Sequence, residues 1–506
     1  MGLYDYTIYS ILRRNVRVFG NRIALKFGEE GISYNEFCEK VDRLACGLLE
    51  VGLQKGDRIG VIAQNCLEYI YLYLAAAKIG AIMLPVNWRL KAQEIEYILR
   101  DATPKIVFIG PEYQDMLNQM IPGIDFVERH YAIGRSGENF ASFNELMENS
   151  MVCPLLPVHS DDAYVIIYTA AVGGRPRGAT LTHRGLVVSN LQAMYYFQLT
   201  ERDCNLSMLP LFHLAGLGAF LNVMQAGGLN IILEKFDVNI ALKHIEQDKV
   251  TIFGEFPPML TSLLDSVKDS SCELSSLRAV FGIDHPDTIK RFEDMTGATF
   301  WTAFGQSETS GFVSFSPYFE RPGSVGLPSC FADVEVMDDC GNIMDTKGVG
   351  EIVVRGPLVF KGYWNLDKDN EYTFRDGWHH TGDMGYFDID GYLWYAGRMA
   401  EKELIKPGGE NVYPVEVEDV ILLHPAVEEV SVIGVPDKEW GEAIKAICVL
   451  KKDMLISETE MIDFVASRIA RYKKPKYVVF VLNLPKTEEG NIDRGVVKIE
   501  HGKSGI

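Results

Sequence analysis

The chain has 506 residues, of which 47% are hydrophobic and 23% are charged, and its formal net charge is −20. That length allows about three or four domains of ordinary size, and the composition is that of a globular protein, which excludes fibrous and disordered classes. The negative charge argues against a broad surface for nucleic acid or anionic membranes, because those partners require positive charge to displace counterions. Any phosphate-bearing ligand must therefore be bound by local basic clusters.

The sequence shows no pattern of a signal peptide or of a membrane span. Arg13, Arg14 and Arg17 follow the first apolar residues, which is the wrong order for a secretory leader. The most apolar stretch, 208–233, contains a proline, a histidine and several glycines, so we interpret it as buried helix and strand. The nine cysteines include no Cys-x-x-Cys pair and are expected to be reduced. These features predict a cytoplasmic protein without integral membrane association.

Short strands alternate with amphipathic helices over most of the chain. Such alternation predicts an α/β fold with parallel sheets that are covered by helices. The predicted strands are 23–27, 58–63, 81–84, 163–169, 230–233, 251–254 and 279–282, with a further one from 300, and the predicted helices are 34–51, 66–79, 92–100, 240–247 and 288–295.

A small and basic segment, 170–178, follows the predicted strand 163–169, and a helix is predicted to resume near His183. Its glycines and arginines are Gly173, Gly174, Arg175, Arg177 and Gly178. Glycines let backbone N–H groups converge on oxyanions, and arginines add charge and paired donors, so the segment fits a polyphosphate cradle. An ordinary surface turn explains it equally well. It is not a Walker loop, which would need lysine and a hydroxyl residue after the last glycine.

Two further polar positions stand near apolar strands. The turn 305–309 lacks the second glycine of a nucleophile elbow, which argues against a serine hydrolase. His213 ends an apolar stretch and precedes several small residues. A lone histidine of this kind is usually structural, but the small residues after it permit close approach of another group, which favours a pocket wall.

From about residue 323 the sequence changes to short strands and tight turns, which predicts a small antiparallel β subdomain over 323–396. Asp383 follows a Thr-Gly turn that could direct its carboxylate at a diol. Beyond a charged linker, 399–406, the residues 407–506 indicate a compact α+β domain. Its basic run 468–476 is either a solvated helix end or a phosphate-binding cluster.

Taken in order, these segments resemble the adenylate-forming (ANL) superfamily of acyl-CoA synthetases, adenylation domains and luciferases, over nearly the whole chain. The segments that carry the resemblance are 168–178, 305–308, 381–383, 397–398 and 408–414. The resemblance implies an N-terminal AMP-binding domain, 1–398, with two helix-covered, mainly parallel sheets and the small β subdomain. It also implies a mobile C-terminal lid domain.

The resemblance further implies the chemistry. A carboxylate attacks the α-phosphate of ATP with Mg²⁺, pyrophosphate leaves, the C-terminal domain rotates, and the thiol of coenzyme A takes the acyl group. Positioning and charge neutralisation carry such a reaction. Glu308 would hold Mg²⁺, Asp383 would accept the ribose hydroxyls, and Arg398 would lie near ribose and phosphate. The implied catalytic residues are Glu308, Arg398, Thr169, His213 and Lys486.

The remaining implied contacts divide by ligand. Phe304 would stack on adenine, His213 and Phe281 with Gly282 would line the acyl site, and Gly408 and Gly409 would approach the pantetheine arm. The nucleotide would also be met by the loop glycines and arginines named above and by Thr302, Gly305, Ser307 and Tyr395. The nucleotide end of coenzyme A would be met by Arg89, Trp440, Arg471, Lys473 and Lys474.

Two departures from the family pattern matter. The loop has Ala-Ala-Val-Gly at 170–173 where hydroxyl residues are usual, and Arg177 replaces a lysine. Near the C-terminus Asn491 stands where the catalytic lysine is expected. Another cation (Lys486, Arg494 or Lys498) could substitute for it, adenylation could be slow, or the protein could bind ligands without turnover. Of the three charged linker residues 401–403, counting back from the glycine pair selects Glu403 as the hinge.

The leading hypothesis is an ATP-dependent carboxylic acid:CoA ligase. Phe212, Phe281 and Phe304 suggest an aromatic, alicyclic or medium-chain acid, and no basic residue obviously awaits a second carboxylate. Asp284 and His285 either place polarity at the pocket floor or lie at the surface. The alternatives are a carrier-protein adenylation domain, a luciferase-like oxygenase and a non-catalytic nucleotide or acyl-CoA-binding homologue. The sequence leaves the oligomeric state open, with a homodimer among the alternatives.

Overall fold

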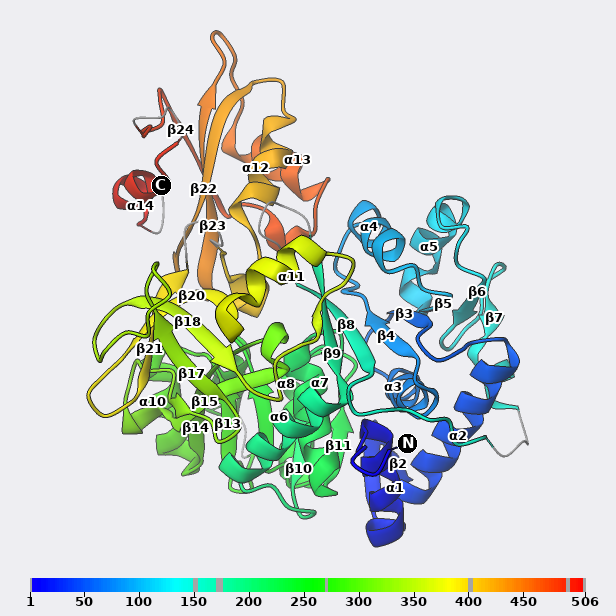
Figure 1. Ribbon diagram of the computed structural model, residues 1–506. Coiled ribbons are helices and arrows are strands. Elements are labelled where there is room, and N and C mark those ends of the chain that lie inside the picture. Colours follow the sequence, from blue (N-terminus) through cyan, green and yellow to red (C-terminus); the bar gives the residue numbers. More distant parts are fainter. Residues whose placement is uncertain are drawn as a thin grey trace.

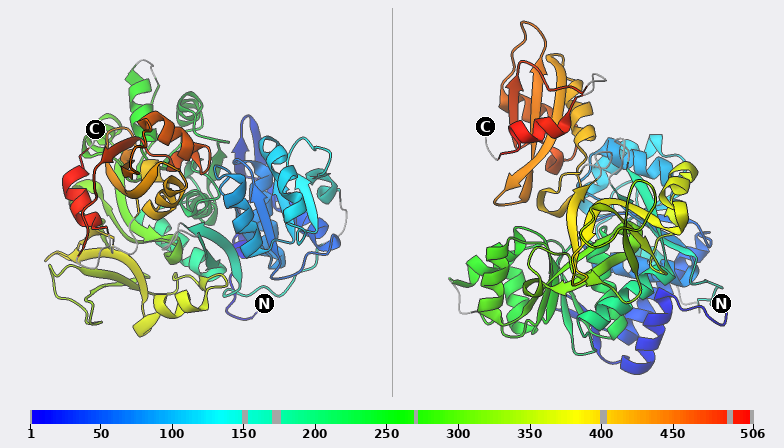
Figure 2. Two further views of the ribbon diagram at one scale, coloured as in Figure 1. Left: turned by 90° about the horizontal axis from the view of Figure 1, so that it is seen from above. Right: turned by 60° about the vertical axis from the view of Figure 1, so that its left-hand side comes forward.

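The computed structural model describes residues 2–148, 153–169, 176–268, 272–398, 404–487 and 492–503. Two large sheets with their helices form the body, and the C-terminal domain stands on top of it in both Figure 1 and the right-hand view of Figure 2. No helix in these ranges is both long and apolar enough to span a bilayer.

The first large sheet has nine strands and is parallel through its centre. Its order is β16 (Leu327–Pro328), β15 (Gly311–Pro317), β14 (Thr299–Gln306), β13 (Ala279–Gly282), β12 (Ile252–Glu255), β10 (Cys204–Ser207), β11 (Leu229–Ile232), β1 (Ile23–Phe27) and β2 (Glu30–Ser33). One face packs on α8 (Val238–Gln247), α9 (Met259–Lys268) and α10 (Pro286–Thr296). Parallel strands of this kind place their carboxyl ends along one edge, where α/β sheets bind ligands.

The second large sheet has eight strands. Its order is β19 (Gly362–Tyr363), β9 (Arg177–Thr182), β8 (Ala163–Thr169), β4 (Ile82–Pro85), β3 (Arg58–Ile62), β5 (Ile106–Ile109), β6 (Arg129–Ala132) and β7 (Ala141–Ser142). Its outer face is covered by α4 (Ala92–Ala102) and α5 (Gln114–Met120). The predicted fold class, mainly parallel sheets covered by helices, is therefore confirmed.

The helices between the two sheets form the largest core. They include α1 (Ile8–Phe19), α2 (Tyr34–Glu50), α3 (Leu67–Ile79), α6 (His183–Tyr196) and α7 (Leu214–Ala226). Every residue of α3 except Glu68 is buried, which explains why its sequence is apolar all round. The stretch 208–233 is the loop before α7, α7 itself and β11, as the interpretation of buried helix and strand requires.

Two elements differ from the sequence-based expectations. Residues 177–182 form β9, which pairs antiparallel with β8 from Thr169↔Arg177 to Ala163↔Thr182. Arg177 and Gly178 of the glycine segment therefore belong to a strand, where a loop followed by a helix was expected, and residues 170–175 lie outside the described residues. The helix α1 was not predicted at all. Thr7 caps it through a box closed by Ser10, which replaces the acidic residue that normally marks such a start.

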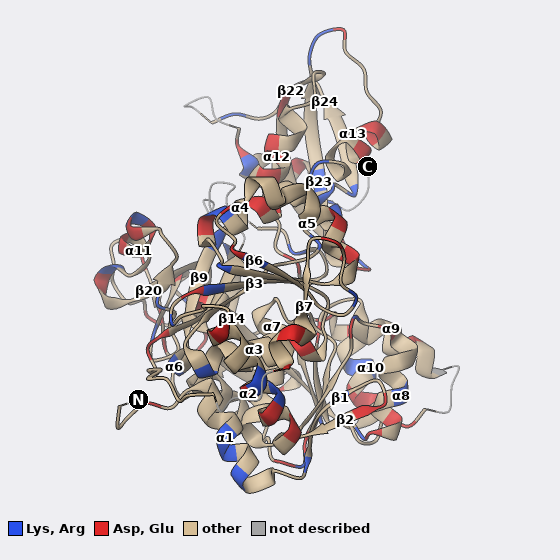
Figure 3. Ribbon diagram, turned by 90° about the vertical axis from the view of Figure 1, so that its right-hand side faces the viewer, with Lys and Arg blue, Asp and Glu red and all other residues tan. Residues whose placement is uncertain are grey.

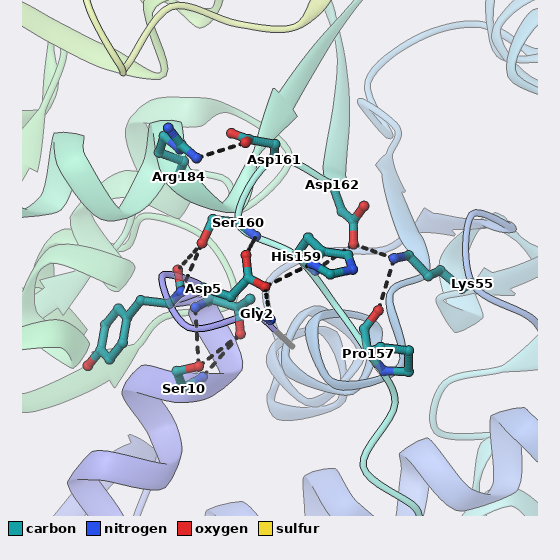
Figure 4. Close-up of polar contacts among 12 residues, drawn as sticks. Gly2, Asp5, Ser10, Lys55, Pro157, His159, Ser160, Asp161, Asp162 and Arg184 are labelled. Atoms are coloured by element: carbon teal, nitrogen blue, oxygen red, sulfur yellow. Dashed lines mark hydrogen bonds and ion pairs between the residues drawn. The ribbon is translucent and has the colours of Figure 1, made fainter.

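The segment before α1 is tied to the loop that leads into β8 (Figure 4). Asp5 accepts hydrogen bonds from the Ser160 N–H at 3.0 Å and lies 2.8 Å from His159 Nδ1. The Ser160 N–H is the largest cause that lowers the pKa of the Asp5 carboxyl. Asp162, on the same loop, forms an ion pair with Lys55 at 2.6 Å. These contacts fix the entry to the strand that carries Thr169.

A four-stranded antiparallel sheet follows the large sheets. Its order is β17 (Asp333–Met337), β18 (Gly350–Arg355), β20 (His379–Phe387) and β21 (Leu393–Arg398), and α11 (Asp367–Thr373) lies before β20. The C-terminal domain has a three-stranded sheet, β22 (Val427–Asp437), β23 (Gly441–Leu450) and β24 (Tyr477–Val481), with α12 (Pro414–Leu422), α13 (Glu458–Ala466) and α14 (Arg494–His501).

Candidate active site

Glu308 lies in a one-turn helix, Ser307–Thr309, that follows β14. Its side chain is 8% exposed, and its Oε1 accepts hydrogen bonds from the Thr169 hydroxyl at 3.1 Å and the Tyr363 hydroxyl at 3.0 Å. Thr169 is the last residue of β8 and Tyr363 belongs to β19, so the second sheet supplies both donors to an acid at the edge of the first. The junction of the two sheets thus holds one oriented carboxylate.

Arg177 extends this cluster. Its guanidinium lies 4.0 Å from the centre of the Tyr363 ring, donates to the Tyr363 hydroxyl at 3.3 Å and pairs with Asp369 at 2.9 Å. Burial, followed by the charge of Glu308, raises the pKa of Tyr363 well above its ordinary value. Tyr363 therefore stays a neutral donor between a carboxylate and a guanidinium.

Asp383 is on β20 and is 1% exposed. Arg398, at the end of β21, lies 2.8 Å from it through Nε, and the Tyr395 hydroxyl donates to it at 3.3 Å. Burial alone would lower the pKa of Arg398, but the charge of Asp383 raises it, so the guanidinium stays charged. Gly382 has φ = 69°, a left-handed conformation that suits glycine and sets the turn before the acid.

The two carboxylates belong to one site. Gln306, two residues before Glu308, donates through Nε2 to Asp383 and, at 3.1 Å, to the Thr381 carbonyl. From the C-terminal domain, Tyr413 has a pKa of about 12, raised first by burial, and the charges of both Glu308 and Asp383 act on it. Glu308, Asp383 and Tyr413 therefore lie close enough together to interact electrostatically.

The donor set fits a magnesium ion that arrives with a nucleotide. Mg²⁺ in such sites binds one or two carboxylates, substrate phosphates and water. Among the described residues no group of three or more His, Cys, Asp or Glu is placed to hold a metal by itself. Glu308, with its two hydroxyl neighbours, would be the protein ligand, and the ion would neutralise phosphate charge.

The glycine pair of the C-terminal domain meets the body at the loop after β12. A side chain on Gly409 would place its Cβ 2.7 Å from the Phe256 ring, and one on Gly408 would lie 2.6 Å from the Trp440 ring. Both glycines have positive φ, 58° at Gly408 and 82° at Gly409. Only glycine combines this conformation with so close an approach of the backbone to the two rings.

Glu410 joins the two domains. It is 6% exposed, forms an ion pair with Arg89, and lies 3.2 Å from His213 Nε2. Burial alone would raise its pKa, but the charges of His213 and Arg89 hold the pKa of Glu410 at about 2. Arg89 is thus engaged with Glu410 in this arrangement, and its assignment to coenzyme A stays a prediction. His213 is drawn to the domain contact and does not stand alone in apolar surroundings.

A second ion cluster lies beside the first. Lys473 is 4% exposed and bridges Glu94 of α4 at 2.6 Å and Glu416 of α12 at 2.7 Å. Figure 3 shows α4 beneath the C-terminal domain, with residues of both charges on these elements. Lys473 is therefore engaged in the domain contact in this arrangement, whereas Arg471 and Lys474 are exposed. The assignment of these three residues to coenzyme A stays a prediction.

The apolar side of the site is aromatic. The ring of Phe281 stacks on Phe197 at 5.2 Å and meets Phe312 edge-on at 6.0 Å. Phe304 is 7% exposed and lies 6.3 Å from Tyr395. Phe304 and Tyr395 are thus neighbours beside Asp383, and Phe281 lies in a separate aromatic cluster.

The other expected site residues fall into three groups. Gly178, Thr302, Gly305, Ser307 and Gly282 lie at or near the carboxyl edges just described. Lys486 pairs with Glu429 of β22 within the C-terminal domain and is 46% exposed, so in this arrangement it is not the missing cation. Gly173, Gly174, Arg175, Glu403 and Asn491 lie outside the described residues.

Sequence reasoning missed several residues of the site. Tyr363 lies in none of the segments that carry the resemblance, and Gln306 and Glu410 lie within such segments but were given no role. Their partners are 55 to 321 positions away in the chain, so their contacts could not be predicted locally. Glu255 is the clearest omission, since a glutamate that ends an apolar strand could have been noticed.

Comparisons with known proteins agree with this geometry. The profile of the AMP-binding enzymes matches residues 12–364, and that of the AMP-binding enzyme C-terminal domain matches residues 416–491. A feruloyl-CoA synthase of Amycolatopsis sp is 34% identical over 97% of this chain and 98% of its own length. An indoleacetate–CoA ligase of Aromatoleum aromaticum is 31% identical over 94% of each chain.

Among solved structures, o-succinylbenzoate CoA synthetase from Bacillus subtilis, a double mutant bound to its product analogue, superposes with a TM-score of 0.86. It is 27% identical and covers 98% of this chain and 99% of its own. One matching profile lies before the linker 399–406 and the other lies after it, and together they cover more than half of the chain.

Proposed function

The chain belongs to the AMP-binding enzymes of the adenylate-forming superfamily, as an AMP-forming acyl-CoA synthetase, and we propose that it activates an aromatic carboxylic acid with ATP and transfers the acyl group to coenzyme A. In the first step the acid carboxylate attacks the α-phosphorus of ATP, and pyrophosphate leaves. In the second step the thiol of coenzyme A displaces AMP from the acyl-adenylate.

The observation that carries the proposal is the joint placement of Glu308 and Asp383. Gln306 ties Asp383 to the turn that holds Glu308, and Arg398 stands against Asp383. One nucleotide could thus be met at its ribose by Asp383 and at its phosphates by Glu308, Thr169 and the hairpin between β8 and β9. Fixed charges of this kind stabilise a phosphoryl-like transition state without reorganisation during the reaction.

Each group would have a distinct task. Asp383 would accept the ribose hydroxyls, while Arg398 would donate to ribose and phosphate. Thr169 would orient Glu308 or a phosphate oxygen, and Mg²⁺ held by Glu308 would supply charge neutralisation. Phe304 would cover the adenine ring.

The C-terminal domain supports the second step in the arrangement described here. Gly408 and Gly409 lie against the loop after β12, and Glu410 and Lys473 form ion pairs that fix them there. We assign this arrangement to thioester formation, with the narrow glycine passage as the route of the pantetheine arm. Adenylation would then require rotation about the linker, with Glu403 as the proposed hinge.

The aromatic class of acid rests on two supports. Phe281, Phe197 and Phe312 form a ring cluster beside the site. The two curated relatives named above carry feruloyl and indoleacetate in their names, and both are aromatic acyl groups. An alicyclic or medium-chain acid would use the same surface with less ring stacking.

A second candidate is a protein that binds nucleotide or acyl-CoA without complete turnover. It is favoured by Asn491 in place of the usual lysine and by the absence of hydroxyl residues at 170–173. Each lost phosphate donor weakens binding by about 1 kcal/mol.

One experiment separates these functions. The protein is incubated with ATP, Mg²⁺ and a panel of aromatic, alicyclic, medium-chain and long-chain acids, with and without coenzyme A, and AMP, acyl-AMP and acyl-CoA are followed by mass spectrometry. Acyl-CoA from the aromatic acids supports the proposal. AMP formation without a CoA ester points to another acceptor. If no product forms but ATP or acyl-CoA raises the Tm, the binding-protein function holds.

A further inference from the structure

Two acids at the carboxyl edge of the first sheet, one buried and one half-buried, take no part in the nucleotide site. The buried acid is Glu255, the last residue of β12, which pairs in register with Gly282, the last residue of β13. The half-buried acid, Asp284, follows two residues after Gly282. The chain neighbour of Glu255, Phe256, is the residue that Gly409 approaches. Glu255 therefore lies next to the residue that the C-terminal domain contacts.

Glu255 has no hydrogen-bonding partner for either carboxylate oxygen in the described part of the chain. One oxygen of Asp284 is likewise buried without a partner there, while the other accepts from the His285 N–H at 2.6 Å. Burying such a group unpaired costs about 1–3 kcal/mol or more, so native proteins seldom do it without a functional reason. The side chain of His285, by contrast, is 73% exposed and lies at the surface.

Burial favours the protonated form of both acids. Burial, followed by the charge of Asp284, raises the pKa of Glu255 well above its ordinary value. The Leu260 N–H acts in the opposite direction, although it does not form a hydrogen bond with Glu255. Burial also raises the pKa of Asp284. A protonated carboxyl group can both donate and accept a hydrogen bond.

Two glycines, Gly282 and Gly254, leave room for the Glu255 carboxyl group and for the Phe281 ring. A Cβ on Gly282 would lie 2.2 Å from the Glu255 carbonyl oxygen and 2.9 Å from its Oε1, so any side chain there would displace the carboxyl group. On the neighbouring position of β12, a Cβ on Gly254 would lie 2.7 Å from the Phe281 ring. Two small residues thus bring one carboxyl group and one aromatic cluster to the ends of adjacent strands.

We propose, resting on the function proposed above, that Glu255, with Asp284 behind it, forms the polar end of the acid pocket and selects an aromatic acid that carries a hydroxyl group distant from its reacting carboxylate. The hydroxyl donates to one carboxyl oxygen and accepts from a protonated carboxyl group. A second carboxylate on the substrate would add a third acid to the pair and is disfavoured. An aromatic amino group is neutral and accepts hydrogen bonds poorly, so it can only donate to the acid and should be selected less well than the hydroxyl.

The test compares matched acids on the intact enzyme. Benzoate and 3-phenylpropenoate are each assayed against their 4-hydroxy, 4-amino and 4-carboxy derivatives with ATP, Mg²⁺ and coenzyme A. We expect the wild type to favour the hydroxylated acid in kcat/KM by about 10- to 100-fold, because a site built for a hydroxyl leaves unpaired groups when it is missing. Equal turnover of the hydroxylated and unsubstituted acids, or a preference for the amino or carboxy derivative, would overturn the proposal.

Variants of Glu255 test whether this residue causes the preference for the hydroxylated acid. Glu255→Leu should bring the ratio of hydroxylated to unsubstituted turnover close to one, while Glu255→Gln should retain part of it. Asp287→Asn on α10, which is 95% exposed, is the matched control and should leave the ratio unchanged. An unchanged ratio in Glu255→Leu would refute the role of Glu255.

A binding readout keeps the two proposals separable. In thermal unfolding, the hydroxylated acid with ATP should raise the Tm of the wild type more than the unsubstituted acid does, and Glu255→Leu should abolish that difference. If no acid yields acyl-CoA, the proposed function fails, yet this difference in Tm still decides for or against the pocket. Glu255→Gln serves where the leucine variant does not fold.

Discussion

The ends of β14 and of β12 contrast within one sheet. At the end of β14, Glu308 is paired with two hydroxyls, and Gln306 connects this turn to Asp383 of β20, which is paired with a guanidinium. At β12, Glu255 has its oxygens buried and without a hydrogen-bonding partner in the described ranges. Paired charges fix the geometry that a common cosubstrate needs, whereas an unpaired acid is stabilised only when the right ligand completes it. The contrast separates the part of the site that performs the chemistry from the part that selects the acid.

The strongest test of the hydrogen-bonded acids, Glu308 and Asp383, is Glu308→Gln. Loss of the charge should lower the rate of acyl-AMP formation by about 100-fold or more, because the phosphates lose their oriented cation. Pyrophosphate release measures it. The matched control Glu371→Gln, on the exposed face of α11, should keep the wild-type rate, and a comparable loss there would contradict the assignment.

The nucleotide site lacks the lysine that the family resemblance implies at position 491, and Asn491→Lys supplies it. We expect acyl-AMP formation to rise by about tenfold, since a charge-assisted contact to phosphate is worth about 1.5–3 kcal/mol. Single-turnover measurement of acyl-AMP without coenzyme A checks this. A rate that stays at the wild-type value would show that another group already does the work of the lysine.

The domain contact can be tested with Glu410→Gln. This change removes the charge that pairs with Arg89 and His213, so the C-terminal domain should be held less firmly against the loop after β12. Transfer of preformed acyl-AMP to coenzyme A should slow by about tenfold, while acyl-AMP formation changes little. The exposed Glu439→Gln is the control. Equal effects on both steps would assign Glu410 to a general structural role.

The smallest expected effect is on pH. Because the pKa of Glu410 falls from its ordinary 4.5 to about 2 on folding, its ion pairs contribute fully above about pH 4.5. That contribution decreases as the pH falls through 4.5 toward 2. Fluorescence of Trp440, which touches Gly408, should report domain release at a higher pH in Glu410→Gln than in the wild type. If the fluorescence of the wild type and of Glu410→Gln changed at the same pH, Glu410 would not stabilise the domain contact.

The sequence predicted most of the fold because its signals are local. The alternation of β-branched strands with amphipathic helices gave β13 at its observed bounds and α2 and α8 to within two residues. It failed at α1, whose cap is closed by serine, and at β9, where the Gly-Pro punctuation hid a hairpin. Both errors concern weak local signals that tertiary packing overrides.

The site divides in the same way. Glu308, Asp383 and Arg398 stand in short motifs with fixed neighbours, and the structure brings them together. Arg89 and Lys473 were assigned to coenzyme A from the family resemblance, and both are engaged in ion pairs across the domain contact in this arrangement. The sequence could not predict those acidic partners, because they lie more than 300 positions away in the chain.

By itself, the amino-acid sequence determined the family, the order of the strands and helices along the chain and the acids that a nucleotide would meet, because glycine turns and apolar periodicity are properties of neighbouring residues. Only the tertiary structure decided which charges are paired and which are left buried and unpaired. That outcome depends on strands and domains far apart in the chain, and it is why Glu255 became visible only once β12, β13 and the C-terminal glycines were in place.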